Sequence, residues 1–292
     1  MRADRARPGP GPRRRRPRLP FPLRLHAVTE PDRDTPPEHP RATPEGTAPP
    51  AAPAGEPAAP SPLERLQRRY LEAQLRGDRR EALRLIDEEG IARGHSVPTL
   101  HLHVITPAQQ EIGRLWQQNV IHVAQEHAAT AISQLVVSHL YRFLPVRPPV
   151  GRRLLVACAP GERHEMGARI ASDLLEAAGF AVHYLGADVP VRDLVAHAVA
   201  TRPDLVVLSA ATGLCTSGLV EAVRALHAAL GDQLPVIVGG AAFTEADTAP
   251  PCQLPDGVLQ HGIDAPGLVA LVCDRLGIPR PPAPDPVVQA AA

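Results

Sequence analysis

The region from Arg152 to Leu276 alternates short apolar runs with longer helical patterns, and this alternation constrains the fold more than any other feature. Three continuous runs have the length and composition of central parallel strands that are covered on both faces: Leu154–Cys158, Leu205–Leu208 and Val236–Val238. Two weaker strand candidates are Ala181–Leu185 and Val258–Gln260. Helical patterns lie between or after them, at residues 165–178, 191–200, 217–229 and 265–276. The sequence therefore predicts an α/β fold with a doubly wound, five-stranded parallel sheet at residues 151–278.

Four amphipathic stretches precede this region and predict helices within residues 62–147. The first two are separated by a break at Gly77-Asp78, and the second contains Ala82 to Ile86. The third runs from Thr99 to Val120, and the fourth from about Val123 to Phe143. Short turns between helices favour antiparallel neighbours, so we expect a four-helix bundle that caps the α/β domain.

The remaining segments lack a hydrophobic period. Residues 1–61 are rich in proline, with small and charged residues in the gaps, so we expect a disordered extension, and residues 279–292 form a similar tail. The stretch from Leu19 to Val28 is interrupted by prolines and charges, which argues against a signal peptide. Residues 2–24 are strongly basic, but the formal net charge of the chain is zero and gives no general argument for binding nucleic acid. No segment is apolar enough to predict a membrane span.

Cysteine and lysine usage excludes several kinds of chemistry. The cysteines lack C-x-x-C spacing and lie mostly in apolar runs, which favours buried free thiols over disulfides or zinc: Cys158, Cys215, Cys252 and Cys273. This usage predicts a cytoplasmic protein. The sequence contains no lysine, which removes a P-loop and Schiff-base catalysis from consideration.

The loop after the first predicted strand contains Glu162, His164 and Gly167. A histidine on such a loop projects above the carboxyl edge of the sheet, where α/β proteins bind ligands. A carboxylate two residues earlier accepts one ring proton and makes the other nitrogen a better metal ligand. A solvated or capping histidine is the plain alternative for this short pattern.

The loops after the next strands carry small or polar residues at the same edge of the predicted sheet. The second loop has Gly186, Asp188 and Val189; the third has Ser209 and Thr212; the fourth has Gly239 and Gly240. Glycines in the fourth loop leave a cleft without side chains, in which a flat group fits between strands. Each loop also has a plain explanation as a tight turn.

Together and in this order, the loops resemble the cobalamin-binding domain of methionine synthase, corrinoid shuttle proteins and B12-dependent mutases. The resemblance covers about Gly151 to Gly277 and implies a flavodoxin-like fold with His164 as the lower axial cobalt ligand. It also implies that the displaced nucleotide tail lies along Ser209, Thr212, Gly239 and Gly240. Glu162 stands where the family usually has aspartate, so the hydrogen bond to His164 starts from a longer side chain.

In the helical region, Trp116 is followed after nine residues by Glu126-His127. Eleven residues make about three helical turns, so these side chains share a face if the helix is continuous. A break near Asn119 would instead place them on adjoining helices. A core tryptophan with an unrelated surface pair is the plain alternative. The pattern resembles adenosylcobalamin-dependent, light-sensing regulators of the CarH type, in which these residues enclose the adenosyl group.

The sequence departs from those regulators in two places. They begin with a MerR-type helix-turn-helix, whereas the first sixty residues here are proline-rich, so direct DNA binding is not expected. Gln117 stands where the family has a histidine that captures cobalt after photolysis. The resemblance therefore implies a sensor that acts through self-association or a regulatory protein partner rather than an enzyme.

Two other functions remain open. A corrinoid methyl carrier that holds methylcobalamin shares the bundle and the His164 loop. A cofactor-free interaction module would bind no corrinoid at all. The polar pair Glu126-His127 favours the sensor, because it suits an adenosyl ribose better than a methyl group.

Overall fold

The computed structural model describes residues 59–145, 147–212, 216–243 and 265–281. The fifth predicted strand, Val258–Gln260, lies outside the described residues, as do Cys215 and Cys252. Nearly all of the predicted extension and most of the predicted tail lie outside them too.

A parallel sheet with the strand order β2-β1-β3-β4 forms the centre of the α/β domain. The strands are β1 (Arg153–Cys158), β2 (Ala181–Gly186), β3 (Leu205–Ser209) and β4 (Val236–Gly239). The predicted α/β class and the parallel, flavodoxin-like order are confirmed, with four strands in the described residues.

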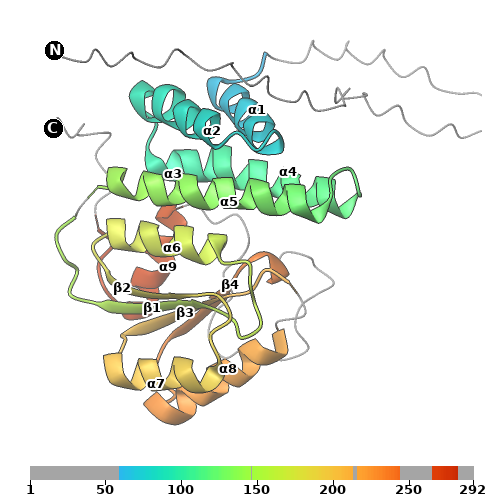
Figure 1. The fold of residues 1–292 in the computed structure, drawn as a ribbon. Helices are drawn as coiled ribbons and strands as arrows, with labels where there is room; N and C mark the ends of the chain where they lie inside the picture. Colours follow the sequence, from blue (N-terminus) through green and yellow to red (C-terminus); the bar gives the residue numbers. More distant parts are fainter. Residues whose placement is uncertain (1–58, 146, 213–215, 244–264, 282–292) are drawn as a thin grey trace, which may run out of the picture. The chain divides into compact units, whose positions relative to one another are not determined.

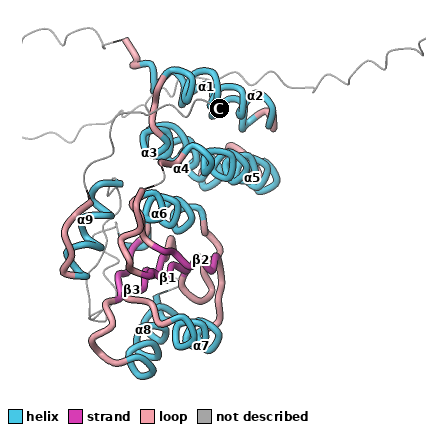
Figure 2. Tube along the Cα trace, turned by 90° about the vertical axis from the view of Figure 1, so that its left-hand side faces the viewer, coloured by secondary structure: helices cyan, strands magenta, loops and turns pink. Residues whose placement is uncertain are grey.

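Helices cover both faces of this sheet (Figure 2). α6 (Met166–Ala177) and α9 (Ala265–Leu276) lie on one face, and α7 (Val191–Thr201) and α8 (Thr216–Leu230) lie on the other. Alternate residues of β1 enter the two cores: Leu155 and Ala157 pack on the α7–α8 side, and Leu154 and Val156 pack on the α6–α9 side. This two-sided burial explains the continuous apolar runs in the sequence.

The strand order reverses at β1. From β1 the chain crosses to β2 on one side and then returns to β3 on the other. The loops that follow β1 and β3 therefore part at the carboxyl edge, which is where open α/β sheets bind ligands.

The helical region comprises α1 (Pro62–Leu75), α2 (Arg79–Leu85), α3 (Val97–Leu100), α4 (Thr106–Gln117) and α5 (Val123–Leu140) (Figure 1). Ser61 and Glu64 form a capping box at the start of α1, and the Asp78 side chain caps α2. One apolar cluster, which includes Leu66, Tyr70 and Ile132, joins these helices.

The third predicted helix differs from the structure in its continuity and its end. A π-helical turn, His101–Ile105, separates α3 from α4, just before Pro107. Proline has no N–H to donate and its ring clashes with the carbonyl four residues earlier, so a wider turn at this point avoids both problems. The helix ends at Gln117 rather than Val120, because Asn119 adopts a left-handed conformation with φ of 57°.

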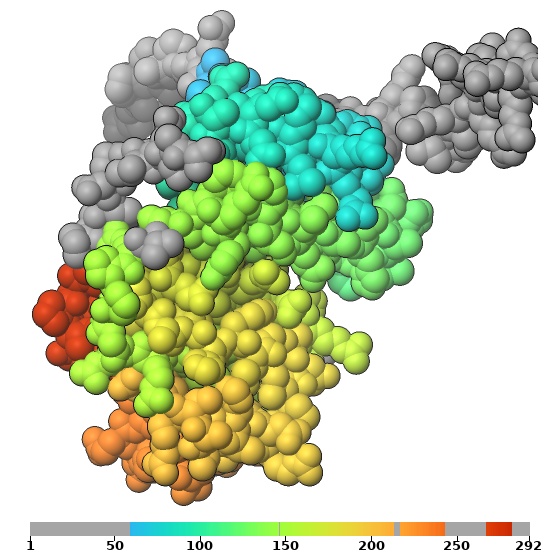
Figure 3. Space-filling view, turned by 60° about the vertical axis from the view of Figure 1, so that its left-hand side comes forward, coloured from blue at the N-terminus to red at the C-terminus, as the bar shows by residue number. Residues whose placement is uncertain are grey.

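The helical region contacts the α/β domain through α6. Met166 and Ile170 pack against the apolar cluster of the helices, and the Tyr141 hydroxyl donates to Glu176 at 2.8 Å. In the space-filling view, the cyan and green helices border the yellow surface of the α/β domain (Figure 3).

Two further sequence predictions are tested within the described residues. Cys158 and Cys273 are buried, as expected. No helix in the described part of the chain has both the length and the apolar character that crossing a membrane requires.

His101 is a polar residue in the core of the helical region. It is fully buried on the π-helical turn, and neither ring nitrogen has a hydrogen-bond partner among the residues that the structure describes. Burial lowers the pKa of His101 from 6.5 to about 4, because the charged ring would lose its hydration.

This burial predicts that acid destabilises the protein through His101. Between pH 6.5 and 4 the unfolded chain binds a proton that the folded chain excludes, so stability falls as the pH drops through this window. Lowering the pH from 7.5 to 4.5 should cost about 2–3 kcal/mol in the wild type through this residue. The His101→Leu variant should lack this part of the loss in stability, as measured by unfolding in urea at both pH values. His103→Leu, at an exposed position of the same turn, is the control. Equal losses in the wild type and His101→Leu would contradict the prediction.

Candidate cofactor site at the carboxyl edge of the sheet

The loop between β1 and α6 holds a buried carboxylate next to an exposed imidazole. The Glu162 side chain is 1% exposed, whereas the His164 side chain is 69% exposed. Glu162 Oε1 lies 2.6 Å from His164 Nδ1 and also accepts the His164 backbone N–H at 2.8 Å. The carboxylate thus holds both the backbone and the ring of His164.

The second carboxylate oxygen of Glu162 binds the loop after β3, across the point where the strand order reverses. Oε2 accepts the backbone N–H groups of Ala211, at 2.8 Å, and Thr212, at 3.2 Å, which follow β3. Glu162 therefore joins the two loops that part at the carboxyl edge.

The loop after β2 forms a backbone hydrogen bond with Glu162. The Asp188 N–H donates to the Glu162 carbonyl at 2.9 Å, and Asp188 Oδ1 accepts the Gly161 N–H at 2.9 Å. Asp188 has a φ of 51°, a left-handed conformation that aspartate adopts more readily than most residues. Three of the four predicted loops thus meet at Glu162.

The electrostatics of Glu162 determine how His164 is presented. Burial raises the pKa of Glu162, but hydrogen bonds from the His164 and Ala211 N–H groups and from the His164 ring more than offset this. The net pKa is below its ordinary value, so the side chain is a carboxylate that only accepts. Nδ1 of His164 must then carry the hydrogen, and Nε2 keeps its lone pair on a mostly exposed ring. This arrangement leaves one ring nitrogen that has the lone pair a metal ligand needs.

Glycines of the site fall into two classes. Gly240 has a φ of 115°, and a Cβ there would lie 2.2 Å from the Ala210 carbonyl oxygen, so the close backbones require glycine. Gly167, in the first turn of α6, would carry a Cβ with nothing within 4 Å. The protein's own packing therefore explains Gly240 but leaves open space at Gly167.

The other predicted loop residues lie near these. Ser209 ends β3, and its carbonyl accepts the Ala159 N–H at 2.8 Å, while the Gly239 carbonyl accepts the Ala210 N–H at 2.8 Å. Gly186 has a φ of 81° and lies beside Glu165, to which Tyr184 donates at 3.2 Å. Val189 packs against the apolar core on the α7–α8 side.

The predicted residues of the helical region lie on two adjoining helices. Trp116 is in the last turn of α4, and Glu126 and His127 lie near the start of α5, as expected for a break near Asn119. Trp116 is 46% exposed, so it is not a core residue. Glu126 Oε2 lies 2.5 Å from His127 Nδ1.

Both regions match family models with the same description. Residues 66–141 and residues 152–262 each match a model described as a B12 binding domain. Both regions are B12-binding domains.

Relatives of the two B12-binding domains include regulators and corrinoid proteins. The HTH-type transcriptional repressor CarH of Myxococcus xanthus is 38% identical over 141 residues, which cover 48% of this chain and 46% of that protein. Dimethylamine corrinoid protein 3 of Methanosarcina acetivorans is 37% identical over 87 residues, which cover 30% of this chain and 41% of that protein. The chain spans less than half the length of either relative.

A solved structure supports the fold alone. The monomethylamine corrinoid protein of Methanosarcina barkeri superposes with a TM-score of 0.59 at 18% identity, covering 72% of this chain and 98% of that one.

Sequence patterns missed two side chains that hydrogen bonds link to the Glu126-His127 pair. The Thr130 hydroxyl donates to Glu126 Oε1 at 2.7 Å, and Gln109 Nε2 donates to the Thr130 hydroxyl at 2.5 Å. Thr130 lies four residues after Glu126 on α5, a spacing that places both on one face and was the available signal. Gln109 comes from α4, and nothing local in the sequence points to it.

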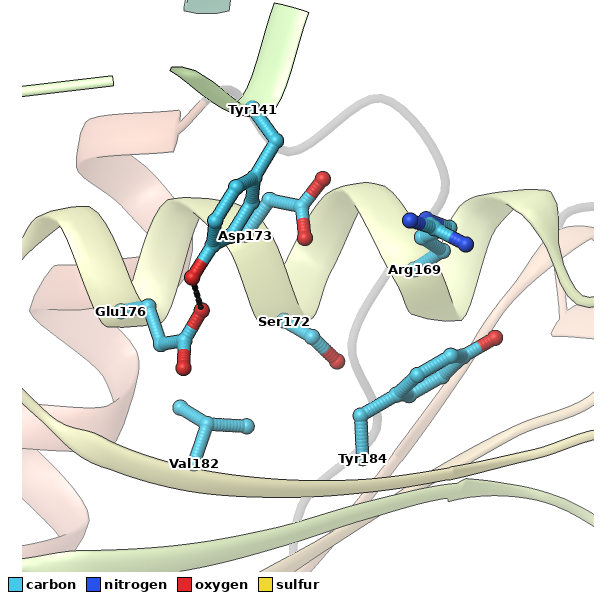
Figure 4. A pocket seen from close by; sticks show the side chains of 7 residues that line it. All are labelled: Tyr141, Arg169, Ser172, Asp173, Glu176, Val182 and Tyr184. Atoms are coloured by element: carbon cyan, nitrogen blue, oxygen red, sulfur yellow. Dashed lines mark hydrogen bonds between the residues drawn. The ribbon is translucent and has the colours of Figure 1, made fainter. Parts of the chain in front are cut away.

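A cavity of about 230 Å³ beside α6 contains none of the predicted site residues. Tyr141, four residues of α6 and two residues of β2 line it (Figure 4). The Asp173 side chain is buried there, and within the described part of the chain its Oδ2 has no hydrogen-bond partner. Burial raises the pKa of Asp173 to about 6, more than the neighbouring Arg169 lowers it. The cavity is thus separate from the His164 loop.

Replacing Glu162 tests the three-loop junction. Glu162→Gln puts an amide NH₂ against N–H donors that need an acceptor, and we expect a loss of about 1–3 kcal/mol in unfolding free energy. Above the ordinary glutamate pKa the carboxylate contributes its full stabilisation, which disappears as the pH falls through the depressed pKa. Denaturant unfolding and nitrogen NMR of His164 measure the stability and the tautomer. Glu165→Gln, which still accepts from Tyr184, is the control. If Glu162→Gln changes neither the stability nor the His164 tautomer, Glu162 does not hold the three loops together.

Asp173 predicts the opposite dependence on pH. Its raised pKa means that the folded state holds a proton more tightly, so stability falls as the pH rises from 3.8 through about 6. Asp173→Asn should therefore stabilise the protein at pH 7.5, by about 1–3 kcal/mol, and less at pH 5. Asp193→Asn, at an exposed position on α7, is the control. No gain for Asp173→Asn in thermal melts at pH 7.5 would rule this out.

Proposed function

We propose that this chain is a cobalamin-dependent sensor in which His164 ligates cobalt from below and the helical domain encloses the upper ligand. The observation that carries the proposal is the buried Glu162 carboxylate, which fixes His164 with its Nε2 lone pair exposed. One imidazole binds a free metal ion weakly. It can complete the coordination of a metal that a macrocycle already holds.

The residues at the carboxyl edge fit such a group. Gly167 leaves open space at the start of α6, close in sequence to His164. Ser209, Thr212, Gly239 and Gly240 would border the nucleotide tail, with Gly186, Asp188 and Val189 on the neighbouring loop. Cobalamin, when bound, supplies a cobalt–carbon bond that visible light breaks.

The helical domain supports adenosylcobalamin as the form recognised. Trp116 offers an exposed aromatic face, and Glu126 and His127 offer a paired acceptor and imidazole. A nucleoside provides a ring for stacking and hydroxyls for hydrogen bonding, whereas a methyl group provides neither.

The response would come from differential contacts. Trp116, Glu126 and His127 contact the upper ligand only while it is present, so its loss changes the free energy of the enclosed state. Tyr141, Met166 and Ile170 join the helical domain to α6 and would transmit that change. We propose that the output is self-association or binding of a regulatory protein in the cytoplasm, without enzymatic activity and without direct DNA binding.

A corrinoid methyl carrier is the second candidate. The identity to dimethylamine corrinoid protein 3 is close to the identity to the repressor CarH, although over fewer residues. A carrier would hold methylcobalamin and meet a methyltransferase, and it would need no preference for an adenosyl group.

Reconstitution in the dark tests the sensor. The protein with adenosylcobalamin should remain coloured after desalting, change its absorption spectrum under green light, and change its elution volume or its binding of a partner. Unchanged spectra and elution after illumination would contradict a light sensor. Equal retention of methylcobalamin would favour the carrier.

Substitution of His164 tests the lower ligand. His164→Ala should lose retention of cobalamin and the spectrum of the histidine-bound form, because the alanine has no lone pair to offer. His183→Ala, an exposed histidine on β2, is the matched control and should bind normally. Normal retention and an unchanged spectrum in His164→Ala would overturn the assignment.

A further inference from the structure

A chain of hydrogen bonds links α4 to the Glu126-His127 pair. Gln109 Nε2 donates to the Thr130 hydroxyl at 2.5 Å, and this hydroxyl donates to Glu126 Oε1 at 2.7 Å. The other carboxylate oxygen lies 2.5 Å from His127 Nδ1, and the His127 side chain is 75% exposed. The chain therefore runs from a partly buried amide to an exposed imidazole.

The direction of these bonds fixes the carboxylate. A threonine hydroxyl has one hydrogen, and since its oxygen accepts from Gln109, the hydrogen is available to Glu126. Glu126 is thereby held on one side by Thr130 and on the other by His127. The Gln109 amide keeps this orientation although its own Oε1 is buried without a partner in the described residues.

Gly113 lies on the same helix as Gln109. It follows Gln109 by one turn and precedes Trp116 by three residues, so all three lie along one face of α4. α4 and α5 run antiparallel, and the Gln109–Thr130 contact sets their register. One turn further along, Gly113 comes level with Glu126.

Neither packing nor backbone conformation requires a glycine at this position. A Cβ at Gly113 would meet no atom of the described residues within 4 Å, and its φ is not in the left-handed region. Glycine inside a helix costs about 1 kcal/mol relative to alanine. The helical domain thus has a destabilising residue on α4, three residues before Trp116, where a Cβ would meet no described atom.

We propose that Gly113 and Thr130 determine the specificity for the upper ligand. Gly113 leaves the volume that a nucleoside occupies, and Thr130 is a positioning residue that aims the Glu126 carboxylate at the ribose hydroxyls. This inference rests on the proposed function, in which Trp116, Glu126 and His127 enclose an adenosyl group.

Filling the space at Gly113 is the first test. Gly113→Leu should leave the ligand-free protein at least as stable as the wild type, because a Cβ there meets no described atom within 4 Å and leucine favours a helix more than glycine does. It should weaken adenosylcobalamin binding by about tenfold or more, the usual effect of a blocked subsite, and leave methylcobalamin binding unchanged. Ala131→Leu, at an exposed position of α5, is the control. Equal binding of adenosylcobalamin by the wild type and Gly113→Leu would overturn the role of Gly113.

Removing the Thr130 hydroxyl is the second test. Thr130→Val keeps the shape but not the hydroxyl, and it should reduce the ratio of adenosylcobalamin to methylcobalamin affinity several-fold, while Thr130→Ser restores the ratio. Ser138→Ala, which removes another hydroxyl of α5, is the control and should leave the ratio unchanged. A wild-type ratio in Thr130→Val, or a failure of Thr130→Ser to restore it, would overturn the positioning role.

The outcomes separate this inference from the proposed function. If the wild-type protein shows no preference for adenosylcobalamin in the dark, the proposed function fails and the inference fails with it. If the wild type prefers adenosylcobalamin and both Gly113→Leu and Thr130→Val keep that preference, only the inference fails.

Discussion

The buried carboxylate of Glu162 is the interaction on which the candidate site depends. Its two oxygens and its carbonyl group bind the loops after β1, β2 and β3 together at the place where the strand order reverses. A buried carboxylate without these donors would be costly, and the loops without the carboxylate would leave N–H groups unpaired. The position and tautomer of His164 follow from that junction, and so does its suitability as a metal ligand.

The two B12-binding domains use a carboxylate and a histidine in a related way. In the α/β domain, one oxygen of Glu162 holds His164 and the other accepts backbone N–H groups. In the helical domain, one oxygen of Glu126 holds His127 and the other accepts the Thr130 hydroxyl. The first carboxylate is held partly by backbone N–H groups of another loop, whereas the second is held by side chains.

The sequence predicted much of this organisation for clear physical reasons. Strands buried on both faces leave continuous apolar runs, so the sequence predicted the fold. The His164 loop directly follows the first of these runs, so the sequence also pointed to the candidate ligand. The donors to Glu162 Oε2 were not, because they are backbone groups of residues 211 and 212, far away in the chain. Gly240 was predicted to line a cleft, and the sequence did not show that a Cβ there would lie 2.2 Å from the Ala210 carbonyl oxygen. The π-helical turn and the Gln109–Thr130 contact depend on tertiary packing that no local pattern encodes.

The central claim of the proposed function is that cobalt would bind Nε2 of His164, the ring nitrogen opposite the Nδ1 that Glu162 holds. Electron paramagnetic resonance of the reduced, cobalt(II) form of the loaded protein measures this directly, since an axial nitrogen splits each cobalt line. Labelling histidine with nitrogen-15 should convert triplet splitting into doublet splitting, and His164→Ala should abolish the change. Splitting that remains a triplet in the labelled protein would show that the axial nitrogen belongs to the cofactor's own base and would contradict the account.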